Sequence, residues 1–267
     1  MSAEERHREI TALVRSQGYM SNEELAQRLN VAVQTIRRDV NQLARRGVVA
    51  RHHGGAGLVS SVENIAYSER QVLNRRAKEA IGQLAARQVP DNSSLFISIG
   101  TTTEAFAKAL RRHKALRVIT NNLHVASPLS AQTDFQVIVT GGLVRFYDGG
   151  ITGSAASTFI EQYRTDFAVI GVSGIEEDGT LLDFDADEIS VTQAMMRNAR
   201  RVYLVADQTK FGRRPMGRVG HLSHIHGFFT DHQPLNGYAP CCVNMVWNCM
   251  LCKGVSEKPV FESPHKS

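Results

Sequence analysis

The sequence predicts an α/β protein with an N-terminal winged helix-turn-helix domain and a C-terminal, mainly parallel α/β domain. Residues 1–58 show helical apolar spacing that leads into a short basic hairpin. The sequence beyond residue 76 instead repeats a strand, a turn and a helix-length segment. A chain of 267 residues is long enough for two separate cores. We therefore expect domains at 1–58 and 76–231, a linker at 59–75 and an atypical tail at 232–267.

Two helices and a turn are predicted first. Residues 10–14 give the first helix an apolar inward face. A second, short helix begins after Ser21, which forms a capping box with Glu24 three residues later. Residues 30–32 then have about the length of the turn between the crossed helices of a helix-turn-helix.

A third helix, over residues 33–46, has an apolar stripe on one face and basic and polar groups on the other. Ile36, Val40 and Leu43 form the stripe at i, i+4 and i+7. The opposite face offers amide and guanidinium groups for base edges and phosphates, and Asp39 is the one acid we expect on it. An ordinary solvated helix is the alternative. With the basic hairpin that follows, we expect DNA to be bound by Gln34, Thr35, Arg37, Arg38, Asn41, Arg45, Arg51, His52 and His53.

The two ends of this helix differ in how well their residues suit a helix terminus. Gly47 follows it where a left-handed residue is favoured. Ala32 precedes it where Ser, Thr, Asp or Asn would cap an amide, a defect of about 1 kcal/mol. We expect packing to offset that loss.

Composition favours a soluble protein with an anionic partner. The net charge is +5 and the isoelectric point is about 9.2. No apolar run approaches a membrane span, and the N-terminus lacks the hydrophobic segment of a signal peptide. No cysteine precedes Cys241, which indicates reducing surroundings. We expect a cytoplasmic protein with no membrane contact.

The second domain is predicted from short runs rich in Ile and Val. We expect a helix over residues 72–88, which ends before Pro90, and then strands separated by helix-length segments. Ligands bind such parallel sheets at the carboxyl ends of the strands. The expected strands are residues 94–99, 116–120, 135–140, 167–172 and 201–206.

Glycine, threonine and amide side chains follow these strands and predict a ligand site. At the first loop, glycine allows close backbone approach, while Thr hydroxyls and helix-opening amides suit phosphate oxygens. An ordinary strand-to-helix turn with a Thr cap is the alternative. Lys210 supplies a point cation that Asp207 could orient, unless the two form a surface salt bridge. The predicted ligand residues after the strands are Gly100, Thr101, Thr102, Thr103, Asn121, Asn122, Gly141, Gly142, Ser173, Gly174, Asp207 and Lys210.

The acidic residues at positions 183, 185, 187 and 188 suggest a calcium-binding loop, but their spacing does not match that of such a loop. Counting from Asp183, Glu188 stands where the loop requires glycine, and Ala194 stands where it requires glutamate. A solvated loop and helix start explains the run, of which we expect Asp183 and Glu188 to face the ligand. We expect no metal ligand and no catalytic residue here.

Six segments of the chain resemble the DeoR family of bacterial transcriptional repressors. The resemblance covers the chain from about residue 3 to residue 231. At the start of the DNA-reading helix the family usually has Ser-Pro, where Ala32 and Val33 stand here. The similar segments are TIRRDVNQLARRGVVARHHGGA (35–56), SIGTTTEA (98–105), TNNLHVA (120–126), GVSGI (171–175), LLDFD (181–185) and DQTKFGR (207–213).

The resemblance implies a repressor of a carbon-catabolism regulon, and among such regulons it favours glycerol 3-phosphate metabolism. It implies release from operator DNA by a phosphorylated metabolite such as glycerol 3-phosphate, a homo-oligomer (dimer or tetramer), and no cofactor. The effector domain would have a fold similar to ribose-5-phosphate isomerase and glucosamine-6-phosphate deaminase. An isomerase-like or deaminase-like enzyme acting on sugar phosphates is therefore the alternative.

The tail departs from the family pattern. It contains all four cysteines and the only tryptophan. Cys249 and Cys252 have the spacing of a zinc knuckle, but the adjacent Cys241 and Cys242 seldom ligate one structural zinc together. We expect no metal in this tail.

Overall fold

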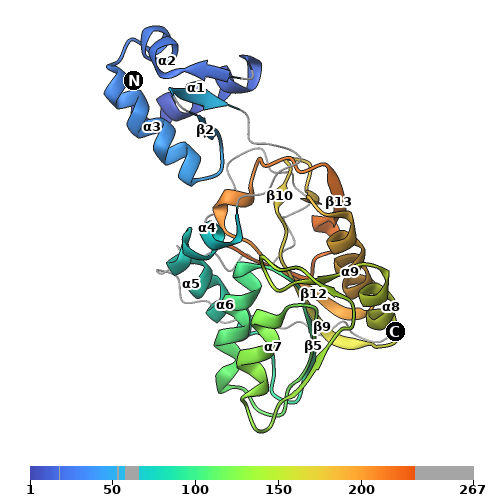
Figure 1. Cartoon of the computed structure of the whole chain (residues 1–267). Coiled ribbons are helices and arrows are strands. Elements are labelled where there is room, and N and C mark those ends of the chain that lie inside the picture. The colour runs from blue at the N-terminus through green and yellow to red at the C-terminus, as the bar shows by residue number, and fades with distance from the viewer. Residues whose placement is uncertain (18, 53, 58–65, 232–267) are drawn as a thin grey trace, which may run out of the picture.

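The protein has two domains in this computed structural model, which describes residues 1–17, 19–52, 54–57 and 66–231 (Figure 1). The smaller N-terminal domain lies beside the larger α/β domain, and the residues that follow α3 (Val33–Arg45) approach it (Figure 1). Predictions for the tail, residues 232–267, lie outside the described residues. Within the described ranges, no helix combines the length and apolar character needed to cross a lipid bilayer.

The N-terminal domain is a helix-turn-helix with a wing, as predicted. Its core is formed by α1, α2 and α3 around Ile10, Leu25, Ile36, Val40 and Leu43. The three short strands form one antiparallel sheet in the order β1-β3-β2, and β1 was not predicted. The elements are α1 (Ala3–Gln17), β1 (Tyr19–Ser21), α2 (Asn22–Leu29), α3 (Val33–Arg45), β2 (Ala50–His52) and β3 (Gly55–Gly57).

The helix ends follow the sequence. The Ser21 hydroxyl accepts a hydrogen bond from the Glu24 amide at 3.1 Å, and the Glu24 carboxylate accepts from the Ser21 amide at 2.8 Å. No side chain caps α3 at Ala32. Gly47 adopts a left-handed φ of +70°, which only glycine tolerates without strain. The predicted capping box and the missing cap are both confirmed.

The segment expected to be a linker contains helix α4 (Tyr67–Val72). Its Tyr67 hydroxyl donates a hydrogen bond to the Glu104 carboxylate at 3.0 Å, so this helix packs on the larger domain. Asn74, with a left-handed φ of +52°, separates α4 from α5 (Arg75–Ala86). The single helix predicted over residues 72–88 is therefore wrong at its start, because the chain turns at Asn74.

The larger domain is organised by a six-stranded sheet in the order β14-β12-β9-β4-β5-β6. Every neighbouring pair is parallel, which confirms the predicted architecture. All five predicted strands are present, and β14 was missed because its run is short. The strands are β4 (Ser94–Ile97), β5 (Arg117–Thr120), β6 (Gln136–Val139), β9 (Thr165–Ile170), β12 (Ala199–Val205) and β14 (Gly227–Phe229).

Helices cover both faces of this sheet (Figure 1). Along β4, Leu95 and Ile97 pack in the core with α5, α6 and α7, whereas Phe96 belongs to the core with α8 and α9. Burial on both faces explains the continuous apolar runs. These helices are α6 (Thr101–Ala109), α7 (Leu123–Ser130), α8 (Ser154–Glu161) and α9 (Ala186–Arg197).

Short elements beyond the sheet edge complete the domain. A hairpin of β7 and β8 follows β6, and a small antiparallel sheet has the order β10-β11-β13. These elements are β7 (Leu143–Val144), β8 (Ile151–Thr152), β10 (Gly174–Ile175), β11 (Thr180–Asp183) and β13 (Gly217–His221), with 3₁₀ turns at Leu110–Arg112, Gln208–Lys210 and Leu222–His224.

Asp39 does not lie on the exposed face of α3, which corrects our expectation. It is buried, and its carboxylate accepts hydrogen bonds from Arg6 at 2.5 Å and His7 at 3.0 Å. Burial alone would raise the pKa of Asp39, but the bonds from Arg6 and His7 outweigh it and hold the pKa below its usual value. Asp39 therefore joins α1 to α3.

We expect Asp39→Ala to lower the free energy of unfolding of the N-terminal domain by about 1–3 kcal/mol, because it leaves buried donors without an acceptor. Urea unfolding followed by circular dichroism measures the change. Glu9→Ala, on the exposed side of α1, is the matched control. Equal stability of the two variants would contradict a structural role for Asp39.

Candidate functional site

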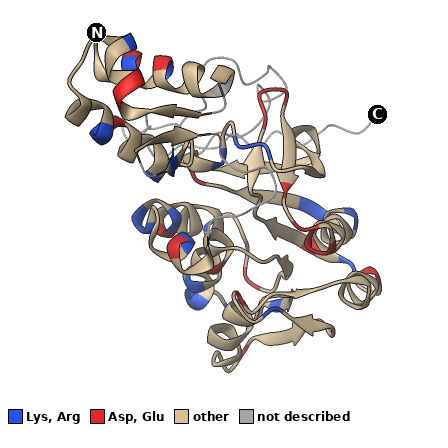
Figure 2. Ribbon diagram, turned by 45° about the horizontal axis from the view of Figure 1, so that its top comes forward, with Lys and Arg blue, Asp and Glu red and all other residues tan. Residues whose placement is uncertain are grey.

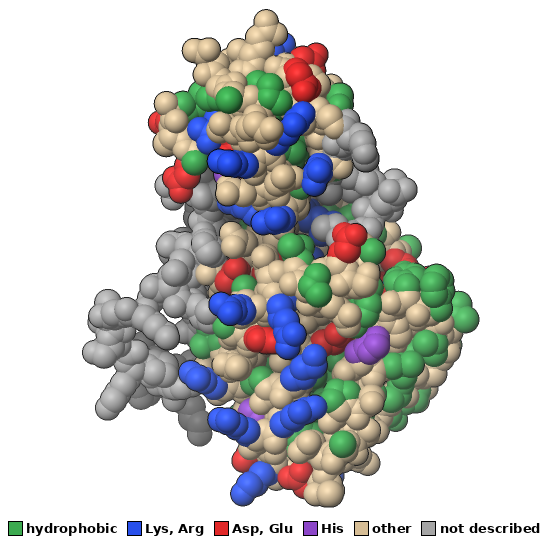
Figure 3. Space-filling model, turned by 60° about the vertical axis from the view of Figure 1, so that its left-hand side comes forward, with side chains coloured by type: hydrophobic (Ala, Val, Ile, Leu, Met, Phe, Trp, Pro, Cys, Tyr) green, Lys and Arg blue, Asp and Glu red, His purple; other side chains and the backbone are tan. Residues whose placement is uncertain are grey.

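The DNA-facing residues predicted on α3 and the wing are largely accessible. Gln34, Arg37, Arg38, Arg45 and Arg51 are exposed, and Thr35 and Asn41 are half-buried. Figure 3 shows Lys and Arg side chains gathered on the α3 side of the N-terminal domain. Acidic and basic residues occur in both domains (Figure 2), and Lys and Arg side chains also appear on the same face of the larger domain (Figure 3). His53 and the His52 side chain lie outside the described residues.

Two further groups extend this surface and were missed from the sequence. Gln42 and Arg46 are exposed near the end of α3. Gln42 stands four residues after Arg38, a spacing that places both on one helix face and could have identified it. Arg37 approaches Glu23 only at 3.9 Å, and both side chains are exposed, so this ion pair leaves Arg37 available.

The first ligand loop connects the central strand β4 to α6. Gly100, at the start of α6, has a φ of +145°, and no side chain caps this helix end. The Thr103 hydroxyl donates to the main-chain oxygens of Ser98 and Gly100, at 2.8 and 2.7 Å, and so stabilises the turn itself. The helix-opening amides beside Thr101 and Thr102 give this end the partial positive charge that binds anions.

A small cavity adjoins this loop and brings together eight of the predicted ligand residues. Its volume is about 20 Å³, room for about one water molecule. Arg70 was not predicted but lines it as well. The predicted residues that line it are Gly100, Thr101, Thr102, Thr103, Ser173, Asp183, Glu188 and Lys210.

Lys210 is the predicted cation of this cavity, which Arg70 also lines. Its ammonium forms no hydrogen bond or ion pair with any described residue. Burial lowers the pKa of Lys210 to about 8, although Asp207 acts in the opposite direction. The buried Asp207 carboxylate accepts instead from the Thr209 amide at 2.9 Å and from the Asn74 side chain at 3.3 Å. Asp207 therefore acts on Lys210 through its negative charge, and the two side chains do not form a hydrogen bond or an ion pair.

The remaining predicted ligand residues do not line either cavity, and several of them contact other parts of the fold. The Asn121 amide donates to the Ile151 oxygen, and Asn122 caps α7 and donates to Glu104. Gly174 starts β10 where an added β-carbon would lie 2.5 Å from the Arg213 oxygen. The residues outside the cavity linings are Asn121, Asn122, Gly141, Gly142, Gly174 and Asp207.

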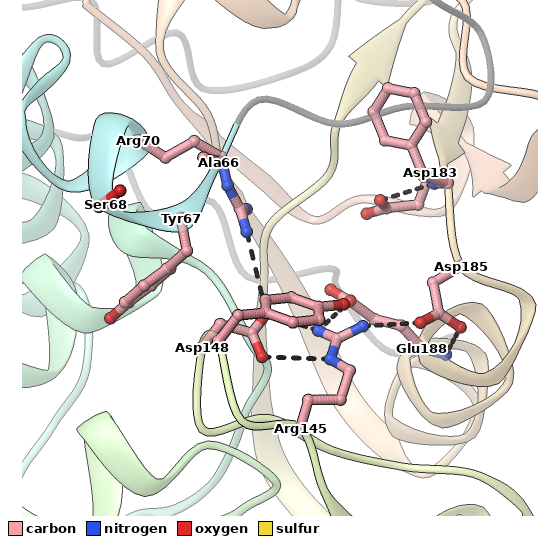
Figure 4. A pocket seen from close by; sticks show the side chains of 11 residues that line it. Ala66, Tyr67, Ser68, Arg70, Arg145, Asp148, Asp183, Asp185 and Glu188 are labelled. Atoms are coloured by element: carbon pink, nitrogen blue, oxygen red, sulfur yellow. Dashed lines mark hydrogen bonds and ion pairs between the residues drawn. The ribbon is translucent and has the colours of Figure 1, made fainter.

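A larger cavity, with a volume of about 430 Å³, lies beside the small one. Arg145 enters it between three carboxylates and bonds Asp148, Asp185 and Glu188, each at 2.7 Å (Figure 4). Its other lining residues include Tyr67, Ser68, Tyr147 and Phe184. Sequence reasoning missed Arg145 and Asp148, although the pair stands shortly after Gly141 and Gly142.

The lining of this larger cavity has more acids than bases, since Asp148, Asp183, Asp185 and Glu188 face Arg70 and Arg145. Burial raises the pKa of Glu188, and Asp183 adds to that rise, while Arg145 opposes it. Burial would lower the pKa of Arg145, but the neighbouring carboxylates raise it further than burial lowers it. Asp185 caps α9 by accepting from the Glu188 amide at 3.2 Å, which fits the helix start expected from the acidic run.

Arg70 of α4 lines both cavities. Figure 4 shows its guanidinium reaching from α4 towards Asp148, and the shortest distance between them is 3.9 Å. Its buried Nε has no hydrogen-bond partner among the described residues. Arg70 was missed because it falls in the segment expected to be a linker.

Two family models match the chain. A DeoR-like helix-turn-helix domain matches residues 6–62, and a DeoR C-terminal sensor domain matches residues 73–232. The chain belongs to the DeoR family. The resemblance of its six sequence segments to that family is thereby confirmed.

Three curated relatives that resemble this DeoR-family chain over most of its length are named as repressors. The glycerol-3-phosphate regulon repressor of Escherichia coli K12 is 47% identical over 88% of this chain and 93% of its own length. The repressor of the same name from Haemophilus influenzae is 43% identical over 93% of this chain and 97% of its own length. The HTH-type transcriptional repressor CsqR of E. coli is 43% identical over 86% of this chain and 88% of its own.

Solved structures similar to this DeoR-family chain include a regulator and an enzyme. The full-length sorbitol operon regulator SorC of Klebsiella pneumoniae has a TM-score of 0.41 and 15% identity, over 84% of this chain and 95% of that one. Ribose 5-phosphate isomerase of Methanocaldococcus jannaschii has a TM-score of 0.39 and 15% identity, over 54% and 56%.

We expect Arg145→Met to lower the free energy of unfolding by about 3–5 kcal/mol, because it leaves clustered carboxylates without their cation. Arg145 lowers the pKa of Glu188, which burial raises to about 8, so its removal would raise that pKa further. The loss of stability should therefore grow as the pH rises from about 7 to about 9, where the wild type releases this proton and the variant keeps it. Thermal unfolding across that range measures it.

Arg200→Met is the control for this variant, because Arg200 is exposed and lies 3.8 Å from Asp166. It should change stability little at any pH. A loss for Arg145→Met that stays constant with pH would contradict the charge argument.

Proposed function

We propose that the chain is a transcriptional repressor that binds operator DNA through α3 and is released by a phosphorylated metabolite resembling glycerol 3-phosphate. The observation that carries this proposal is the combination of an exposed basic helix with an uncapped, lysine-lined helix end in one chain. Its repressor relatives support a regulator rather than the enzyme considered as the alternative.

The DNA side of the proposal rests on α3. Its apolar stripe is buried in the domain core, which turns Arg38, Asn41 and Gln42 outward or part-way outward. Amide and guanidinium forks suit base edges in the major groove, and the neighbouring arginines suit phosphates. The wing residue Arg51 is exposed beside them.

The effector side rests on charge and geometry at the small cavity. A phosphate would accept hydrogen bonds from the amides that open α6 and from the hydroxyl of Thr102, and Lys210 would supply the opposite charge. The carboxylates of the larger cavity cannot favour a phosphate, but they accept hydrogen bonds from ligand hydroxyls. The two cavities together thus suit a small phosphorylated polyol.

Binding would require the small cavity to widen, since its volume of about 20 Å³ is too small for a phosphate. Arg70 lines that cavity and belongs to α4, which follows the N-terminal domain in the chain. A phosphate would attract the Arg70 guanidinium and so displace or reorient α4. This movement is one route from the ligand to the DNA-binding domain.

A second route is a contact between the domains. A β-carbon added at Gly47, directly after α3, would lie 3.4 Å from the main-chain oxygen of Thr209. Thr209 immediately precedes Lys210 in a 3₁₀ turn. The end of α3 therefore rests on the segment that carries the proposed phosphate-binding cation. Ligand binding relieves repression only if it favours the conformation with low operator affinity.

We expect Arg38→Ala to weaken operator binding strongly while the fold and ligand response persist, because one lost bidentate contact costs about 1–3 kcal/mol. Fluorescence anisotropy with labelled operator measures it, and wild-type affinity should fall with salt by a log-log slope of about 0.9 per phosphate neutralised. Arg112→Ala, exposed on the larger domain, is the control. Unchanged affinity of Arg38→Ala would contradict the role of α3.

We expect Lys210→Ala, and separately Thr102→Val, to bind operator as tightly as the wild type but to resist release by glycerol 3-phosphate. Each lost charge-assisted contact costs about 1.5–3 kcal/mol, which raises the required ligand concentration about tenfold or more. Operator titrations with and without ligand measure this.

Two controls test whether release depends on the ligand phosphate and on Lys210 rather than on any polyol or any lysine. Glycerol without the phosphate should release none of the proteins, and Lys114→Ala, an exposed lysine, should respond like the wild type. Release of Lys210→Ala at the wild-type ligand concentration would show that the 207–213 segment is structural.

A further inference from the structure

Apolar side chains are exposed in a patch that runs from the end of β6 through the β7–β8 hairpin. Phe146 is 97% exposed and Leu143 is 77% exposed. The Phe146 and Tyr147 rings contact each other, and a β-carbon added at Gly149 would lie 3.4 Å from Leu123. We call this the hairpin patch, and its residues are Leu123, Val139, Leu143, Val144, Phe146 and Tyr147.

The hairpin patch adjoins an unprotected sheet edge. β6 is the last strand of the six, and among the described residues no strand pairs with its outer side. Residues 136–144 contain no charged residue and no proline. Free edge strands are normally blunted by charges, proline or a covering element. The neighbouring Arg145 adds no charge to the surface, since its side chain is only 11% exposed and is bound to acids of the larger cavity.

We propose that the hairpin patch and the β6 edge bind a second copy of this chain about a two-fold axis. In such an interface the same surface faces itself, so a patch dominated by one charge sign would repel its own copy. The hairpin patch is uncharged and can meet itself without that penalty. Its exposed aromatic and aliphatic side chains are of the kinds enriched at interface cores.

A helix-turn-helix gives independent grounds for a second copy, because such domains read paired half-sites as dimers. The other available occupant is the chain's own tail. It begins after β14, at the opposite edge of the six-stranded sheet from β6. The cross-linking test below distinguishes this occupant from a second copy.

The first test is the mass of the full-length protein by sedimentation equilibrium. In the double variant Leu143→Glu/Phe146→Glu, the new negative charges of one copy would meet those of the other copy across the interface. Their repulsion should weaken self-association by more than about tenfold and halve the measured mass of the assembly. The control is Val72→Glu/Met216→Glu, since these apolar side chains are both 74% exposed but lie outside the patch. An unchanged mass for the patch variant would overturn the proposal.

The second test leaves the surface nearly intact. A photo-reactive phenylalanine analogue at position 146 of the full chain should give a covalent product of two chains, with the cross-link in residues 123–147 of the other copy. Mixing isotopically light and heavy chains distinguishes links between copies from links within one. Cross-links to residues 232–267 of the same chain, or yields no higher than with the analogue at position 216, would overturn the proposal.

Discussion

The proposed effector site depends most on the ammonium of Lys210, which is half-buried and is bonded by none of the described residues. Lys210 stands at the carboxyl ends of the parallel strands, where burial lowers its pKa to about 8 and no described residue bonds it. Burying an unpaired charge costs free energy that a protein must recover elsewhere. An anionic ligand would supply the missing counter-charge at the uncapped start of α6. Such a ligand would add its charge to that of Asp207, which acts on Lys210 without bonding it.

Charge also separates the two cavities into different chemical environments. The small one places Lys210 and Arg70 beside a helix start, with Asp183 and Glu188 on its other side. In the larger one, Arg145 is already bonded by three carboxylates. This division suits a ligand with an anionic end and a hydroxylated end. Because Arg70 belongs to α4 and Gly47 rests on Thr209, the anionic end is also the one nearest to the DNA-binding domain.

Periodic patterns in the sequence predicted the winged helix-turn-helix and five of the six parallel strands, because buried stripes and doubly buried runs leave a direct trace in apolar spacing. The Gly100 loop and Lys210 were found because both follow strands. Arg70, Arg145 and Asp148 were not, since single charges in connecting segments carry no periodicity and depend on folding to meet. Asp39 was misplaced because a carboxylate among arginines resembles a surface residue until its partners on α1 are known.

The central claim is that Lys210 binds the phosphate of the effector. Calorimetric titration with glycerol 3-phosphate at pH 8, in buffers of different ionisation enthalpy, measures the protons taken up on binding. A partly protonated Lys210 that becomes fully protonated beside a phosphate should take up a fraction of a proton per site at this pH. At pH 8 the ligand phosphate is already fully ionised, since its second pKa is about 6, so it contributes little to the uptake. Binding without proton uptake at pH 8, or the same uptake by Lys210→Met, would contradict the account.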